Sequence, residues 1–172
     1  MRVAIAVLLI AGCAWSAAAS LTGSTVTLIE PSGPVPPIPP LAINLTFEVQ
    51  KDLTSDERIM HVWITLPSVL SADSGSMWHD EIAPGRPAFH HASHGSTLYY
   101  MDDVDGTGGI WLGETVEIGA VAAAATPHDW PDVLWMRWWL VGSLGNDITG
   151  TLCIPTTPVE SRTWGRIKAL YH

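Results

Sequence analysis

An acidic, glycine-rich stretch at residues 102–109 has the residue types that bind a hard cation. Three aspartates begin it, Asp102, Asp103 and Asp105, and glycines fill much of its second half. Carboxylates on a turn relaxed by glycine can surround Ca²⁺, which takes about six to eight oxygen ligands. Glu114 lies beyond the stretch, where it can return a further ligand. The spacing differs from an EF-hand, and the same residues favour plain turns, so a calcium site and a simple turn are both open.

A group of histidines is the second candidate metal site. Neutral imidazoles suit Zn²⁺ or Cu²⁺, and His90 and His94 share a face on either a helix or a strand. The His-Glu-x-x-His pattern of metalloproteases is absent, because Ala92 follows His91. The ligands of a zinc or copper site would be His79, His90 and His94. The alternative is that these are solvated loop side chains.

Tryptophan is concentrated between residues 130 and 139. On a strand, Trp135 and Trp139 point to one face of the sheet and Trp138 to the other. Large rings therefore occupy both faces, and at least one is expected to be exposed or to cover a loop. Exposed rings stack on sugars, which makes these three tryptophans a candidate carbohydrate-binding set. The alternative is burial of the rings inside a two-sheet core.

The composition narrows the class of protein. Of 172 residues, 47% are apolar and 15% charged, with a formal net charge of -9. These values predict one compact domain rather than a disordered chain, and the negative charge argues against a nucleic-acid partner. The sequence has no Gly-x-Ser-x-Gly elbow, phosphate loop or dinucleotide fingerprint. We therefore expect a non-enzymatic protein with no catalytic residues. Cys153 is predicted to be a small, buried apolar residue of a strand.

Residues 1–19 have the pattern of a secretory signal peptide. Arg2 precedes an apolar run over residues 3–13, and small residues follow before Ser20. The run is too short to cross a bilayer, which takes about 20 apolar residues, so we expect no transmembrane segment in the mature chain. Residues 10–13 also match a bacterial lipobox, which would place a lipid anchor at Cys13. Cleavage before Ser20 and cleavage at Cys13 both remain open.

A proline-rich segment is expected to separate a short leader from the main domain. Residues 20–30 form a short β-rich leader, and residues 31–40 contain six prolines. Such a segment is extended and cannot join the interior of a sheet. We interpret it as a spacer, with a ligand for a proline-binding module as the alternative.

The pattern over residues 41–155 predicts an all-β domain. Apolar and polar residues alternate in several short runs, which is typical of strands with one buried face. We expect turns at residues 52–56, 71–76, 106–109 and 142–147, and strands at residues 43–50, 59–66, 98–101, 115–123, 133–141 and 150–154. In residues 59–66 the inward set is Met60, Val62, Ile64 and Leu66. The expected fold is an antiparallel β-sandwich. Residues 121–125 and 133–140 are also compatible with helix.

Residues 156–172 form a different kind of segment, a tether followed by a basic amphipathic tail. The apolar side chains fall at helical spacing, at Trp164, Ile167, Leu170 and Tyr171. A short helix of this kind can dock on its own domain, on a partner groove or on an anionic surface.

Two short motifs resemble segments of exported bacterial proteins. Residues 163–171, Thr-Trp-Gly-Arg-Ile-Lys-Ala-Leu-Tyr, resemble a C-terminal Thr-Trp-Gly-x-Ile-Lys-x-Leu-Tyr tail, and residues 102–114 resemble part of the immunoglobulin-like domains that carry it. The resemblance spans residues 45–172 and implies an immunoglobulin-like β-sandwich with a surface, binding or structural role. Those tails usually end in a basic residue, whereas this one ends in His172.

Together these observations predict a secreted or cell-surface protein, extracellular or periplasmic, with a structural, adhesive or binding role and stabilisation by Ca²⁺. Its expected partner is an extracellular protein or a glycan surface. The alternatives are a carbohydrate-binding module and a small secreted metalloenzyme.

Overall fold

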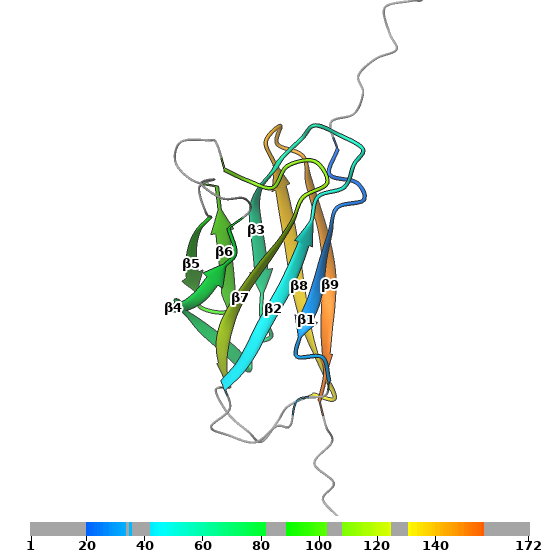
Figure 1. Ribbon diagram of the computed structural model, residues 1–172. Helices are drawn as coiled ribbons and strands as arrows, with labels where there is room; N and C mark the ends of the chain where they lie inside the picture. The colour runs from blue at the N-terminus through cyan, green and yellow to red at the C-terminus, as the bar shows by residue number, and fades with distance from the viewer. Residues whose placement is uncertain are drawn as a thin grey trace, which may run out of the picture.

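The computed structural model describes residues 20–33, 35, 42–81, 89–102, 108–124 and 131–156. Every regular element in these ranges is a strand, and none is a helix. The nine strands are β1 (Thr25–Glu30), β2 (Ala42–Gln50), β3 (Ile59–Thr65), β4 (Leu70–His79), β5 (His90–His94), β6 (Thr97–Met101), β7 (Thr115–Ala124), β8 (Val133–Gly142) and β9 (Asp147–Pro155). They form two layers (Figure 1). The all-β, antiparallel two-sheet prediction is confirmed.

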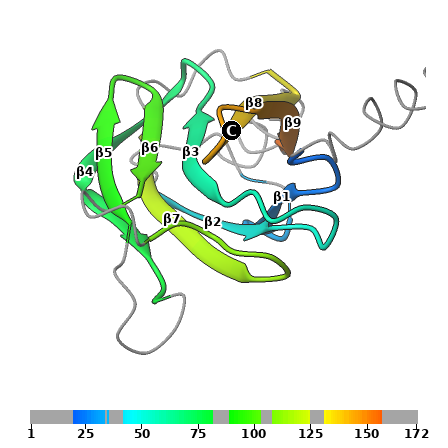
Figure 2. The same cartoon turned by 90° about the horizontal axis from the view of Figure 1, so that it is seen from above.

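Each layer is one antiparallel sheet. The four-stranded sheet has the order β1-β2-β7-β4, and the five-stranded sheet has the order β5-β6-β3-β8-β9. Central pairs such as β2 with β7 and β3 with β8 join segments far apart in the chain. Seen from above, β4 lies beside β5 where the two layers approach each other (Figure 2). There the Ser93 amide donates to Ser74 Oγ at 2.9 Å, which ties the edges together.

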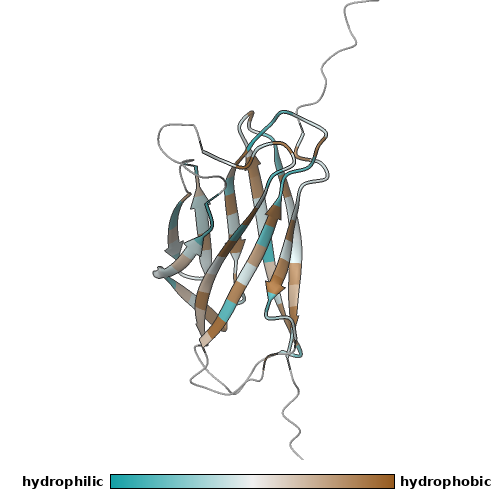
Figure 3. Ribbon diagram, in the orientation of Figure 1, coloured by the Kyte–Doolittle hydropathy of each residue, from teal (hydrophilic) through white to brown (hydrophobic). Residues whose placement is uncertain are grey.

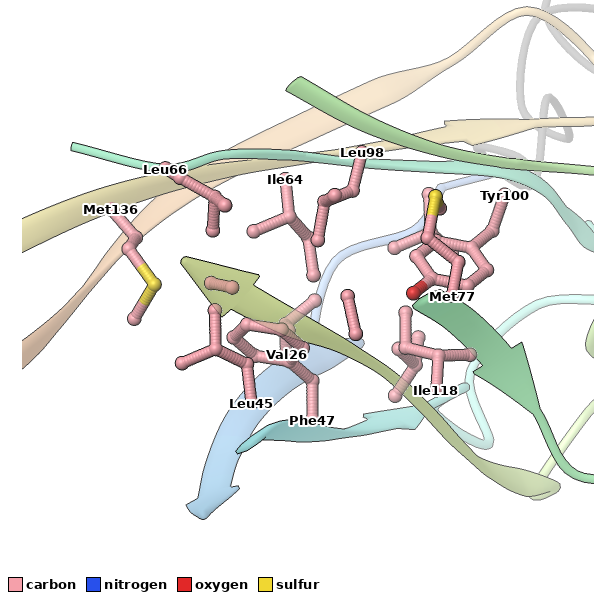
Figure 4. Close-up of a cluster of buried hydrophobic side chains, with 14 of the residues drawn as sticks. Val26, Leu45, Phe47, Ile64, Leu66, Met77, Leu98, Tyr100, Ile118 and Met136 are labelled. Atoms are coloured by element: carbon pink, nitrogen blue, oxygen red, sulfur yellow. The ribbon is translucent and has the colours of Figure 1, made fainter. Parts of the chain in front are cut away.

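Alternation along the strands builds the core between the sheets. In β2, Leu45, Phe47 and Val49 are buried, and Figure 3 shows the alternation of apolar and polar residues along the ribbon. Side chains from both sheets meet in one cluster (Figure 4). Within it, the Tyr100 hydroxyl donates to the Gly119 carbonyl oxygen at 2.6 Å, from one sheet to the other. Burial raises the pKa of Tyr100 well above its usual range.

The turn predicted at residues 71–76 is wrong, because these residues lie inside β4. The pairing of β4 with β7 is irregular between Ala72 and Met77. An irregularity of this kind interrupts the two-residue period, and polar side chains occupy it. Ser76 Oγ donates to the Val121 carbonyl oxygen at 3.0 Å, so the polar residues bond to the sheet itself.

The sandwich begins ahead of the proline-rich segment. β1, which lies in the expected leader, pairs with β2 from Thr25 opposite Gln50 onward. Leu21 is fully buried in the same core. The Val35 amide donates to the Pro155 carbonyl oxygen at 3.0 Å, so this point of the proline-rich segment lies against the end of β9. The leader is therefore an edge of the four-stranded sheet rather than a separate unit.

Several predictions concern residues outside the described ranges. They are the signal peptide over residues 1–19 with its lipid-anchor alternative at Cys13, most of the proline-rich segment, and the tail side chains Trp164, Ile167, Leu170 and Tyr171. Among the residues that the structure describes, no helix is long and apolar enough to cross a bilayer. Of the segments left open between helix and strand, residues 121–125 and 133–140, the described part of the first belongs to β7 and the second belongs to β8, and residue 125 lies outside the described residues.

Candidate functional site

The outward face of the five-stranded sheet brings aromatic side chains from three strands into one row. The register aligns Tyr99 of β6 with Trp63 of β3, and Trp63 with Trp139 of β8. Their inward neighbours Val62 and Leu140 are fully buried, so these three rings face away from the core. The ring centres of Trp63 and Trp139 are 4.7 Å apart, and those of Trp63 and Tyr99 are 5.8 Å apart.

These three rings line a groove rather than a flat platform. Trp63 is inclined at 69° to Tyr99 and at 80° to Trp139, which is edge-to-face packing. The groove has a volume of about 740 Å³, within the range of roughly 300–1,000 Å³ typical of small-ligand sites. We call it the aromatic groove; its lining residues are Trp63, Thr65, Thr97, Tyr99, Arg137, Trp138, Trp139, Thr149, Gly150 and Thr151.

The second row of the groove is polar. Two residues along each strand from the rings, on the same face, the register aligns four polar residues: Thr97, Thr65, Arg137 and Thr151. The Thr65 and Thr97 hydroxyls lie 3.4 Å apart. Arg137 is exposed, and its guanidinium has no hydrogen-bond or ion-pair partner among the described residues. The groove thus combines an aromatic wall with hydroxyl groups and a single positive charge.

The outward face of the four-stranded sheet has the opposite electrostatic character. Glu48 of β2 stands directly opposite Glu117 of β7. Two carboxylates side by side give this part of the sheet a negative charge, which would repel an anionic ligand. The aromatic groove, whose lining has Arg137 as its one formally charged residue, therefore differs in sign of charge from this pair on the other sheet.

The predicted tryptophans divide between the two sides of β8 as the two-residue period requires. Trp135 is 61% exposed and Trp139 39% exposed, both on the outward face. Trp138 packs inward against the core. Its ring crosses Gly150 on β9 so closely that a Cβ at Gly150 would lie 2.3 Å from Trp138 Cζ2. Of the three, Trp135 alone does not line the aromatic groove.

The structure does not bring the predicted histidine ligands together. His90 and His94 lie on the outward face of β5, separated by four residues, which is about 13 Å along a strand. His79 belongs to β4 and contacts the ring of His91, with ring centres 5.5 Å apart. Burial lowers the pKa of His91, and the charges of His79 and His90 lower it further. No group of three or more metal-ligating side chains occurs in the described residues.

The acidic stretch is described only at its two ends. Both carboxylate oxygens of Asp102 are buried without a hydrogen-bond partner. Glu114 Oε2 accepts a hydrogen bond of 2.7 Å from the Trp111 amide, within the turn that precedes β7. Asp103 and Asp105 lie outside the described residues.

Sequence reasoning missed Trp63, Tyr99 and Arg137 as members of one site. The signal was present, because the inward assignment of Val62 and Ile64 puts Trp63 on the other face. What the sequence lacks is the register, which sets Trp63 between Tyr99 and Trp139.

Comparison with known proteins reveals shared architecture. No family model and no curated protein matches the sequence. The major pilin subunit of Bacillus cereus superposes with a TM-score of 0.54 at 12% identity, over 78% of this chain and 40% of that one. The N-terminal domain of a Streptococcus gordonii adhesin gives a TM-score of 0.55 at 8% identity, over 80% of this chain and 33% of that one.

An uncharacterised Nocardia farcinica protein with an immunoglobulin-like fold is 16% identical, with a TM-score of 0.49, over 77% of this chain and 98% of that one. The chain spans less than half the length of the pilin and adhesin chains. At these identities the likeness concerns the β-sandwich fold.

Proposed function

We propose that this chain is an exported, non-enzymatic β-sandwich of the immunoglobulin-like class that binds a partner at the cell surface. The aromatic groove is the observation that supports this role. Aromatic rings, hydroxyls and one guanidinium line it, and its lining contains no carboxylate, imidazole or thiol. The hydroxyls of Tyr99 and the lining threonines would need a neighbouring general base to act as nucleophiles, and the lining residues supply none. The groove is therefore equipped to bind rather than to catalyse.

Binding to a surface tests this function directly. The exported protein is applied to surfaces coated with extracellular glycans or matrix proteins, and bound protein is measured. Trp139→Ala removes a half-exposed ring from the groove, and we expect at least a tenfold loss of binding, because aromatic anchors dominate such contacts. Trp135→Ala, on the same strand and face but outside the groove, is the matched control and should retain binding. Equal binding by both variants and the unaltered protein would contradict the proposal.

Export is the second part of the proposal, supported by the charged, apolar and small-residue order of residues 1–19. Two of the solved structures with the same architecture are named as a pilin subunit and an adhesin. The full chain is produced in a bacterium with its own leader, and the exported form is sequenced from its N-terminus. We expect Ser20 as the first residue, with a lipid-modified Cys13 as the alternative product. Retention of the uncleaved chain in the cytoplasm would refute export.

A carbohydrate-binding module is the second candidate function, favoured by the exposed ring of Trp139 beside Trp63. A metalloenzyme built on the histidines would need His79, His90 and His94 to converge. Their separation gives that alternative no support.

We also propose that the acidic stretch holds calcium, with Asp102, Asp103, Asp105 and Glu114 as ligands. The support is Asp102, whose buried carboxylate oxygens lack a hydrogen-bond partner, since a buried charge is costly without one. A specific site raises stability by about 2.7 kcal/mol at a calcium concentration 100 times Kd. Thermal melts in EDTA and in rising calcium measure this for the unaltered protein and for Asp102→Asn. An unchanged melt from micromolar to millimolar calcium would eliminate the site.

A further inference from the structure

We propose that the aromatic groove binds an acidic glycan, a chain of sugar rings carrying carboxylate groups, with Arg137 pairing with a carboxylate. The proposal rests on the binding role of this face and names its ligand class. Three properties of the groove support it: its aromatic rings, the hydroxyls of its threonines and the positive charge of Arg137.

The aromatic wall suits the apolar faces of sugar rings. Trp63 lies between Tyr99 and Trp139, and neighbouring rings are inclined at 69° and 80°. Trp139 is 39% exposed, so part of its ring is accessible for stacking with a pyranose. The rings span β6 to β8, and the groove continues to β9, so that it crosses three strand spacings, about 14 Å. This length accommodates a short oligosaccharide lying across the strands.

The threonine hydroxyls of the groove favour a glycan over an apolar partner. Four threonines line the groove beside the rings, at Thr65, Thr97, Thr149 and Thr151. Covering hydroxyls and a guanidinium with an apolar helix or loop would desolvate them without replacement hydrogen bonds, which is costly. A sugar chain presents C–H faces to the rings and hydroxyls to the threonines. A glycan can therefore contact the aromatic rings and bond to the threonine hydroxyls at the same time.

The charge of the groove selects an acidic glycan over a neutral one. Arg137 is the single formally charged residue of the lining and has no partner among the described residues. A guanidinium binds a carboxylate through two parallel hydrogen bonds. On the same face, Asp147 of β9 lies opposite Val141, four residues from Arg137 along β8 and so about 13 Å from it along the strand. The carboxylate of the ligand is therefore placed at the Arg137 end of the groove, away from Asp147. The Glu48 and Glu117 pair faces away on the other sheet.

Calorimetric titration tests the proposal with two trisaccharides of equal length. The acidic probe is trigalacturonic acid, the neutral one α-1,4-linked galactotriose, and trimers of mannuronate and guluronate extend the acidic set. At least one acidic trimer should bind ten times or more tightly than the neutral trimer. Arg137→Gln should remove this preference, a loss of roughly tenfold for one charge-assisted pair, and raising the salt from 50 to 500 mM should weaken acidic binding severalfold.

Two tryptophan variants and a proline-rich peptide test whether binding occurs in the aromatic groove and whether a glycan is its ligand. Trp139→Ala should abolish binding of every trimer while Trp135→Ala retains it, with thermal melts confirming that both variants are folded. Failure of all acidic trimers to bind, or an unchanged preference in Arg137→Gln, would overturn the inference. So would tight binding of the peptide Pro-Val-Pro-Pro-Ile-Pro-Pro, because aromatic grooves also hold polyproline helices. If no trimer binds but Trp139→Ala still loses surface binding, the glycan inference fails while the proposed function stands.

Discussion

Glu57 is a buried carboxylate that holds the β8–β9 turn, and its removal is expected to destabilise the sandwich. The residue is 2% exposed. Its Oε1 accepts hydrogen bonds from the amides of Leu144 at 3.1 Å and Asn146 at 3.3 Å, and its Oε2 accepts from Asn146 Nδ2 at 2.9 Å. The carboxylate also fills the space above Gly142, where a Cβ would lie 2.0 Å from Oε1.

The expected loss for Glu57→Ala is about 2–4 kcal/mol. Hydrogen bonds to charged groups contribute about 1.5–3 kcal/mol each, but two of the three are long, and the side chain of Leu144 is 67% exposed. Water therefore replaces part of the lost bonding. A loss of this size lowers Tm by roughly 4–16 °C.

Urea unfolding at neutral pH measures the change in free energy. Glu57→Gln is the matched control, because it keeps the shape and one accepting oxygen but loses the charge and the second acceptor; we expect about half the effect. If Glu57→Ala unfolds within about 0.5 kcal/mol of the unaltered protein, the assignment of Glu57 as the anchor of the turn is incorrect.

Three further perturbations test the packing and the pH response. Tyr100→Phe removes the hydroxyl that donates to the Gly119 carbonyl oxygen, and urea unfolding should show a loss of about 1–2 kcal/mol; no loss would mean that this bond does not tie the sheets together. Gly150→Ala forces the Trp138 ring to move. We expect the free energy of unfolding to fall by about 1–3 kcal/mol and the near-ultraviolet circular dichroism to change. An unchanged spectrum would contradict the close contact. Because burial lowers the pKa of His91, the unfolded chain takes up a proton below about pH 6.5 before the folded chain does. Stability should therefore fall as the pH drops from about 6.5 through the folded pKa, and His91→Gln should reduce that fall when unfolding is measured at pH 7.5 and pH 5; an identical fall in this variant would count against His91.

The strands that were predictable from sequence are those whose period of two is uninterrupted. In β3 the period is regular after a register shift between Ile59 and His61, and there alternation correctly placed Val62 and Ile64 inside. Met60 was also predicted to face inward, but it lies at the shift and is only half-buried. β4 was hidden because its pairing is irregular between Ala72 and Met77, so its serines and glycine looked like a turn. β5 was hidden because its histidines have no strong preference between strand and loop.

The site was less predictable than the strands because it depends on long-range register. Alternation correctly set Trp135 and Trp139 on the face opposite Trp138. It could not show that Trp63, far earlier in the chain, lies between Tyr99 and Trp139. Strand order and register arise from packing between distant segments, and the groove exists only once four strands are aligned.

The central claim is that the outward face of the five-stranded sheet is the working surface, and blocking each face in turn tests it most directly. Cys153, predicted from sequence to be buried, is instead an exposed free thiol on that face, opposite Trp135, because its position in β9 points away from the core. Val121 lies on the outward face of the other sheet and is 39% exposed. A polyethylene glycol chain is attached to Cys153, or to the introduced thiol of Val121→Cys in a Cys153→Ser background, and surface binding is measured. We predict that the polymer at position 153 abolishes binding and that the polymer at position 121 leaves it intact; the reverse result, or equal binding by both, would contradict the account.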